Sequence, residues 1–337
     1  MGSVIAVALA CTTFVLPNGG VGKCYDWHMG QGILVVNKRD VLKRALPIMP
    51  GDRPASWTSR FASVTFNQYG REFPNGGMNE AGLVVEIMWL AASREPAPDE
   101  RPTVNELQWI QYQLDRFATA GEVLAHAGEL RVSRVHGKVH YLACDRGGAC
   151  VAIEFLDGKL VATPGARVLT NDPYAASLAY LKRHAGFGGS EAIPSGAGSL
   201  ERFARASSLV AAAKGALPDA AFAVLDAVNN DASQWHIVYD PVRLRVWYRL
   251  RGDKRIKWFD LSRFDGSCAA PAKSLDLAVD ASGDVTSRFT DYDAELNRRT
   301  VENGLSGIGL PPPAIEGVAR YPGLLQCSEK LMQRNNP

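Results

Sequence analysis

The chain has 337 residues, 46% of them hydrophobic, which is enough for one large domain or two around a buried core. Its formal net charge of +2 gives no reason to expect a nucleic acid or another acidic partner, and no run of about 18 apolar residues suggests a membrane span. The six cysteines and six histidines show neither Cys-x-x-Cys pairs nor histidine pairs at helical spacing, so no metal and no cofactor are expected.

The N-terminus carries the first sign of chemistry. A short apolar leader ends in Ala8-Leu9-Ala10, and Cys11 follows it directly. A cut after Ala10 would give Cys11 both a thiol and a free α-amine, and such an amine can accept the proton of a nearby thiol near neutral pH. We therefore predict that residues 1–10 are removed and that residues 11–337 form a single domain with Cys11 as its nucleophile.

Two interpretations of this leader stay open. As the remnant of an export signal it places the protein in the periplasm or outside the cell, where Cys144–Cys150 or Cys268–Cys327 bridges become possible. The leader is short and lacks a positively charged start, so either its start is truncated or it is a pro-segment, which leaves a cytoplasmic location open. The sequence does not choose between these interpretations. Lipoprotein processing is disfavoured, because it requires Leu where this chain has Ala8.

The sequence predicts strands and helices in separate blocks. Pro17-Asn18-Gly19-Gly20 separates two apolar runs and predicts a hairpin that begins at Cys11 and ends near Asp26. The predicted strands are residues 11–16, 21–25, 33–37, 61–66, 82–89, 139–144, 150–155, 160–163, 235–239 and 243–250. The predicted helices are residues 104–117, 120–126, 175–184 and 200–214, the last with Ser199 as its N-cap. This pattern predicts an α+β fold with two packed antiparallel sheets between helical layers.

Four polar clusters stand out along this pattern. They are Lys23-Cys24-Tyr25-Asp26-Trp27, residues 77–83 around Asn79, residues 169–173 around Asn171, and residues 201–205 around Arg202. With Trp57-Thr58-Ser59, residues 107–115 and Gln234-Trp235, they resemble the choloylglycine hydrolase family, which includes penicillin V acylases and conjugated bile salt hydrolases. The resemblance implies the four-layer αββα sandwich of N-terminal-nucleophile hydrolases and a homotetramer.

Hydrolysis of an amide needs a nucleophile, a proton acceptor and hydrogen-bond donors for the oxyanion of the tetrahedral intermediate. Cys11 would supply the first two. The resemblance implies that Asn79 and Asn171 are the oxyanion donors, that Asp26 holds the nucleophile and that Arg202 favours its thiolate. Each asparagine cluster taken alone is also typical of an ordinary turn.

Three further residues bear on the site. The family has arginine three residues before the aspartate, whereas this chain has Lys23, a catalytic candidate that keeps the charge without the planar fork of arginine. Trp27 and Trp89 resemble the tryptophans that line the acyl pocket in the Gram-negative branch of penicillin V acylases. Aromatic walls favour an aryl or long acyl group. The alternative is that both tryptophans belong to the core.

These residues predict a cysteine amidase that cleaves the linear amide bond of a small apolar N-acyl substrate through a thioester. Penicillin V and N-acyl homoserine lactones are substrates of this type, each with an apolar acyl group, an amide and a ring next to it. A conjugated bile salt hydrolase or an acyltransferase of the same fold is an alternative. A relative that binds acyl amides without turnover is the alternative from another class.

Overall fold

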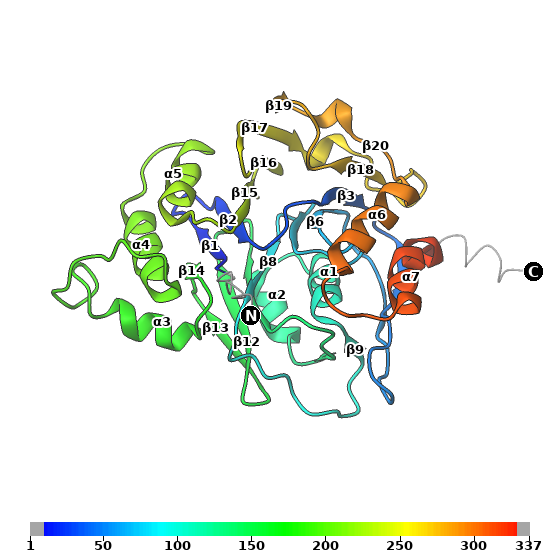
Figure 1. The fold of residues 1–337 in the computed structure, drawn as a ribbon, viewed down its shortest axis with the longest axis horizontal. Coiled ribbons are helices and arrows are strands. Elements are labelled where there is room, and N and C mark those ends of the chain that lie inside the picture. Colours follow the sequence, from blue (N-terminus) through cyan, green and yellow to red (C-terminus); the bar gives the residue numbers. More distant parts are fainter. Residues whose placement is uncertain (1–9, 329–337) are drawn as a thin grey trace, which may run out of the picture.

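The computed structural model describes residues 10–328, and within this range two large β-sheets form the centre of the molecule (Figure 1). The larger sheet has nine strands in the order β13-β12-β11-β8-β7-β6-β3-β18-β20. They are β3 Ile33–Asn37, β6 Ser63–Asn67, β7 Gly76–Asn79, β8 Val84–Trp89, β11 Val139–Cys144, β12 Cys150–Leu156, β13 Lys159–Pro164, β18 Lys273–Asp276 and β20 Thr290–Asp291. All neighbouring strands of this sheet are antiparallel.

The second sheet has seven strands within the described range, in the order β14-β1-β2-β15-β16-β17-β19. They are β1 Thr12–Val15, β2 Val21–Asp26, β14 Val168–Leu169, β15 Ser233–Asp240, β16 Arg245–Leu250, β17 Asp253–Asp260 and β19 Gly283–Asp284. All pairs are antiparallel except β17 and β19. Smaller sheets join β4 Val41–Arg44 with β5 Ser56–Thr58 and β21 Gln326–Cys327, and β9 Thr103–Val104 with β10 Arg131–Val132.

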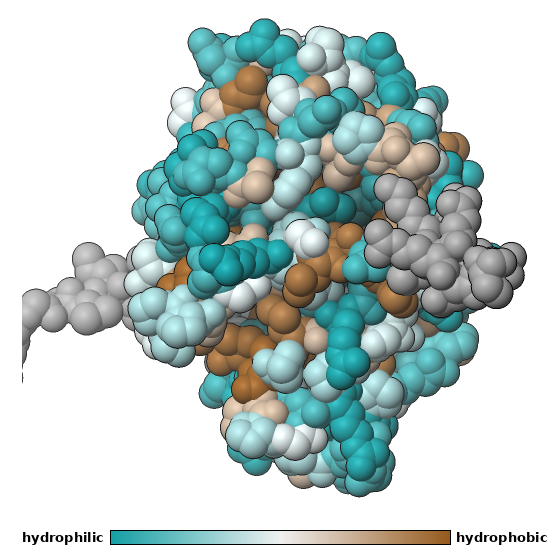
Figure 2. Space-filling model, turned by 90° about the vertical axis from the view of Figure 1, so that its right-hand side faces the viewer, coloured by the Kyte–Doolittle hydropathy of each residue, from teal (hydrophilic) through white to brown (hydrophobic). Residues whose placement is uncertain are grey.

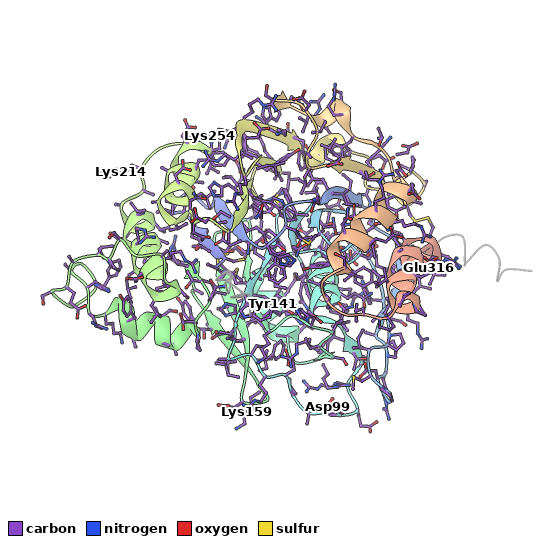
Figure 3. All side chains as sticks on the ribbon, in the orientation of Figure 1. Asp99, Tyr141, Lys159, Lys214, Lys254 and Glu316 are labelled. Atoms are coloured by element: carbon purple, nitrogen blue, oxygen red, sulfur yellow. A yellow bond between two sulfur atoms is a disulfide. The ribbon has the colours of Figure 1, made fainter. Side chains whose placement is uncertain are left out.

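Helices cover the outer faces of both sheets. The larger sheet is covered by α1 Glu106–Arg116 and α2 Ala120–His126, and the other by α4 Ser199–Ala212 and α5 Asp219–Val228, with α3 Tyr174–Leu181 packed on α4. Tyr141 of β11 lies in the middle of the molecule in Figure 3, where its ring stacks on Trp109 of α1 with centroids 4.2 Å apart. The predicted αββα sandwich is confirmed.

The C-terminal part of the described range adds two helices that the sequence analysis did not predict. Helices α6 Ala294–Leu305 and α7 Pro312–Arg320 pack on each other and lie on the right in Figure 1, away from α3, α4 and α5. Glu316 points outward from α7 (Figure 3) and accepts hydrogen bonds from Arg298 of α6. Short 3₁₀ turns at Leu261–Arg263, Thr286–Arg288 and Tyr321–Leu324 complete this region.

One predicted helix start is wrong. Helix α4 begins at Ser199, and its N-cap is Gly198, whose N–H donates to the Glu201 carboxylate at 3.0 Å. The Ser199 hydroxyl is used elsewhere: it accepts a hydrogen bond from the Asn171 N–H at 2.9 Å and donates to the hydroxyl of Thr170 at 3.1 Å. The side chain that could cap the helix therefore supports the neighbouring loop instead.

Both disulfides that the sequence left possible are present. Cys144–Cys150 joins β11 to β12, and Cys268–Cys327 joins two segments 59 residues apart. The free cysteines are Cys11 and Cys24, both buried. Among the helices of residues 10–328, none has the length and apolar composition that a membrane crossing requires.

A buried ion pair connects the two sheets. Lys23 of β2 lies 3.7 Å from the Glu86 carboxylate of β8, and its ammonium also donates to the Ile87 carbonyl. The hydroxyl of Tyr239, from β15, donates to Glu86 at 2.6 Å. Burial raises the pKa of Glu86 to about 7, although Lys23 and the Tyr239 hydroxyl favour its ionised form.

This pair predicts how stability depends on pH. The folded pKa of Glu86 is above its ordinary value of 4.5, so the folded chain binds more protons than the unfolded chain between the two values. The contribution of Glu86 to stability is therefore present at low pH and is lost as pH rises toward 7. In Lys23→Met the carboxylate lacks its cation, so its folded pKa rises further. The stability lost on raising the pH then becomes larger, by up to about 1.4 kcal/mol for each unit by which the folded pKa rises.

Urea unfolding at about pH 5.5 and about pH 8 measures this slope in the wild type and in Lys23→Met. The double variant Lys23→Met/Glu86→Gln, which has no carboxylate to titrate, is the control and should show a flatter dependence. Equal slopes in the wild type and in Lys23→Met would contradict the coupling of the two groups.

Candidate active site

Cys11 lies directly before β1, at the wall of a cavity of about 420 Å³. The turn at residues 17–20 sets the register of the β1–β2 hairpin, in which Thr12 lies opposite Cys24. This register brings the end of β2 to Cys11, and the Asp26 N–H donates to the Cys11 sulfur at 3.4 Å. The predicted hairpin thus places the two residues in contact.

The Asp26 side chain is buried and held by three groups around it. One carboxylate oxygen accepts from the Cys24 thiol at 3.0 Å, and the other accepts from the Asn230 amide at 2.6 Å. Burial raises the pKa of Asp26, while the hydrogen bonds of Ser233, Cys24 and Asn230 and the charge of Arg202 act in the opposite direction. Cys24 is therefore a buried partner of the carboxylate.

Arg202 joins the nucleophile to the Asn171 loop. Its guanidinium group donates to the Cys11 carbonyl at 2.9 Å, to the Thr12 hydroxyl at 2.5 Å and to the Asn171 side-chain oxygen at 2.7 Å. The third nitrogen donates to the Ala197 carbonyl at 3.0 Å, next to the start of α4. One buried planar group thus fixes the relative positions of the nucleophile, the loop and the helix.

Asn171 lies in the loop between β14 and α3 with its backbone and side chain both held. Its N–H donates to Ser199, and its side-chain oxygen accepts from Arg202. The side-chain NH₂ donates one hydrogen to the Trp89 carbonyl at 2.9 Å. A carboxamide has two such hydrogens, and within residues 10–328 the second has no acceptor.

The structure does not bring Asn79 into the site. Its NH₂ group donates to the carbonyls of Leu114 and Phe117 at 2.8 and 2.7 Å, and its oxygen accepts from the N–H groups of Ala81 and Leu83. Every polar atom of this side chain is used, because the β7–β8 turn packs against the end of α1. The prediction that Asn79 is an oxyanion donor is therefore wrong, and the alternative of a structural turn holds.

Burial and the neighbouring charges together set the pKa of the Cys11 thiol. Burial raises the pKa of the thiol, and the negative charge of Asp26 adds to this effect, whereas Lys23 and Arg202 lower it. The thiol is therefore protonated near neutral pH and needs a proton acceptor next to it. While Cys11 is joined to Ala10, its nitrogen is an amide and cannot serve as that acceptor.

Trp27 and Trp89 both line the cavity, with ring centroids 6.2 Å apart and planes inclined at 44°. From Cys11 and these rings the cavity continues to the C-terminal helices. Its far wall consists of Leu305, Ile308, Leu310, Ala314, Gly317 and Val318. Figure 2 looks onto the side of the molecule that carries α6 and α7, and apolar residues gather in the middle of this face.

Residues that the sequence analysis missed complete the site. The Glu106 carboxylate accepts from the N–H groups of Val135, His136 and Gly137 at 2.8–2.9 Å and so fixes a loop at the rim of the cavity. Asn230 is bonded to Asp26, and Ser199 is bonded to Asn171. The one available signal was the position of Glu106 in the first turn of a predicted helix, because the other contacts join segments that are distant in sequence.

Comparison with known proteins agrees with this arrangement. No family model matches the chain. The chain is 26% identical over 332 residues to a penicillin V acylase of Pectobacterium atrosepticum, and the match covers 82% of this chain and 88% of that protein.

Solved structures establish the fold. The penicillin V acylase of Agrobacterium tumefaciens matches with a TM-score of 0.73 and 24% identity, over 84% of this chain and 98% of its own. A mutant of the conjugated bile acid hydrolase of Clostridium perfringens matches with a TM-score of 0.65 and 15% identity, over 81% of this chain and 98% of its own. The homologous acylase and the shared fold thus support the resemblance of this chain to the choloylglycine hydrolase family.

Proposed function

We propose that this amide-hydrolysing enzyme cleaves the linear amide bond of an apolar N-acyl substrate through a thioester on Cys11. The observation that carries the proposal is the position of Cys11 at the wall of an apolar cavity, in contact with Asp26 and held by Arg202. Asn171, bonded to the same arginine, supplies an unused N–H. Nucleophile, supporting charges and oxyanion donor are thus joined by direct contacts.

The reaction begins after the bond between Ala10 and Cys11 is cut. The new α-amine of Cys11 takes the proton of its thiol, and the sulfur attacks the amide carbon. The oxyanion that forms accepts a hydrogen bond from the free N–H of Asn171. The α-ammonium then protonates the leaving amine as the C–N bond breaks and a thioester forms. Water attacks the thioester, its proton goes to the α-amine, and the carboxylic acid leaves as the thiol is restored.

The cavity indicates which part of the substrate is recognised. Trp27 and Trp89 flank the end near Cys11, and α6 and α7 close the far end, so an extended acyl chain or an aryl group would be enclosed by apolar side chains. Such walls bind through burial of apolar surface and offer little to a polar amine product. We propose that the enzyme selects its substrate by the acyl group and tolerates different amine parts. Penicillin V and N-acyl homoserine lactones would both suit such an enzyme.

The two disulfides support a location in an oxidising compartment, and we propose the periplasm or the cell exterior. The homotetramer stays a prediction.

The first test concerns the nucleophile. Active protein is expected to begin at Cys11, because only then is the α-amine free, and Cys11→Ala should abolish turnover. N-terminal sequencing of active protein and the intact mass of a trapped acyl-enzyme measure both points. Turnover above roughly a few per cent in Cys11→Ala, or full activity in protein that retains residues 1–10, would refute the assignment.

The second test compares the two asparagines. Asn171→Ala removes the free N–H and should lower kcat by about 10²–10³, the usual effect of losing one oxyanion donor. It also removes the bonds to Arg202 and to the Trp89 carbonyl, so both this variant and Asn79→Ala should lower the free energy of unfolding by about 1–3 kcal/mol. Asn79→Ala should leave kcat of the folded enzyme near that of the wild type, because its bonds are structural. Kinetics and urea unfolding of both variants separate the roles. A large loss of kcat in Asn79→Ala, with kcat of Asn171→Ala near that of the wild type, would show that Asn79 belongs to the site.

The third test concerns the acyl pocket. Ala314→Trp should fill the far end of the cavity and lower kcat/KM for a dodecanoyl amide, by roughly fourfold for each methylene displaced at about 0.8 kcal/mol each. A short acyl amide should be unaffected. Trp89→Ala should penalise phenoxyacetyl and long-chain substrates together, because it removes one of the two tryptophan rings that line the cavity.

The matched control for this test is Pro313→Trp, at the exposed neighbouring position of α7 outside the cavity lining. An equal ratio of long-chain to short-chain kcat/KM in wild type and in Ala314→Trp would show that the acyl group does not reach α7.

A further inference from the structure

A second buried polar pair lies outside the cavity lining and has no part in the reaction described above. His140 of β11 and Glu154 of β12 are neighbours across the two antiparallel strands, and both side chains are buried. The Nδ1 atom of His140 is 3.0 Å from the Glu154 carboxylate, and its Nε2 atom is 2.7 Å from the Thr170 carbonyl. The two contacts require one hydrogen between Nδ1 and the Glu154 carboxyl group and another between Nε2 and the Thr170 carbonyl.

Both partners of this pair hold the loop that carries Asn171. Thr170, whose carbonyl accepts from His140, directly precedes Asn171. The Glu154 carboxylate accepts from the backbone N–H of Tyr174, with N···O distances of 3.0 and 3.3 Å. The pair therefore fixes the loop on both sides of Asn171 with charge-assisted hydrogen bonds.

Two of the other contacts of Asn171 come from a single helix. The Ser199 hydroxyl and the Arg202 guanidinium hold its backbone nitrogen and its side-chain oxygen. Both side chains come from α4, so they would follow any movement of that helix. The strands β11 and β12 belong to the larger sheet, which also carries Trp89, the residue whose carbonyl accepts from Asn171.

We propose that His140 and Glu154 are positioning residues for catalysis. Their hydrogen bonds attach the loop of residues 170–174 to the larger sheet and so direct the free N–H of Asn171 to the oxyanion. The inference rests on the proposed function, since it assigns the reason for which Asn171 is held. Misplacement of such a donor by about 1 Å costs on the order of a hundredfold in rate.

The experiment uses the mature enzyme with His140→Gln and Glu154→Gln. Glu154→Gln keeps the volume and an acceptor oxygen, so it tests the charge even if His140→Gln does not fold. Both variants should lower kcat by about ten- to a hundredfold with KM nearly unchanged. The rate at which iodoacetamide alkylates Cys11 should stay near that of the wild type, because alkylation forms no oxyanion. Asn79→Ala is the matched control for a loss of buried hydrogen bonds elsewhere.

A double-mutant cycle links the pair to Asn171. Glu154→Gln should have no further effect on kcat in the Asn171→Ala background, because the donor that it positions is absent. Additive effects, unchanged kcat in the folded single variants, or a parallel fall in alkylation would overturn the inference while leaving the proposed function intact. Full activity of Asn171→Ala itself would refute the oxyanion role and this inference with it.

Discussion

The hydrogen bonds of Arg202 are the interaction on which the rest of the site depends. Its guanidinium group is buried and reaches only neutral oxygen atoms of Cys11, Thr12, Asn171 and Ala197. Burial lowers the pKa of Arg202, while the charge of Asp26 acts in the opposite direction. A cation without a direct carboxylate partner keeps its field for its surroundings, and the Cys11 thiol is one of the groups that it favours in the ionised form. The same group thus fixes the geometry of Cys11, the proposed nucleophile, and favours its thiolate.

Lys23, unlike Arg202, has a direct carboxylate partner. Its ammonium contacts the Glu86 carboxylate and the Ile87 carbonyl between the two sheets, so part of its field is neutralised locally. The arginine that the family resemblance places here would have a planar fork able to hold two partners, which an ammonium group lacks. The effect of Lys23 on Cys11 is consequently electrostatic only, and its first structural effect is on the packing of one sheet against the other.

The sequence predicts local features of the site well. An Asn-Gly turn fixes the register of a hairpin, and the register alone places Asp26 beside Cys11. The role of Asn79 could not be predicted, because its partners are carbonyls at the end of a helix that begins 27 residues later. His140 and Glu154 likewise become neighbours only when β11 pairs with β12. Contacts within one turn follow from the residues, whereas contacts between elements depend on the packing of the whole sandwich.

The cavity has a polar end and an apolar end that different segments of the chain form. Its chemical end is made by the first strands of the chain and the α4 region, and its far end by α6 and α7, whose sequences carry no catalytic motif. An apolar wall needs only side chains of suitable size, so many sequences can form it, whereas the polar atoms around Cys11 each need a specific partner. Changes in α7 can therefore alter which acyl group fits without disturbing Arg202, Asp26 or Asn171. On the proposed function, the choice of acyl group is separable from hydrolysis, because different segments of the chain supply the apolar wall and the polar site.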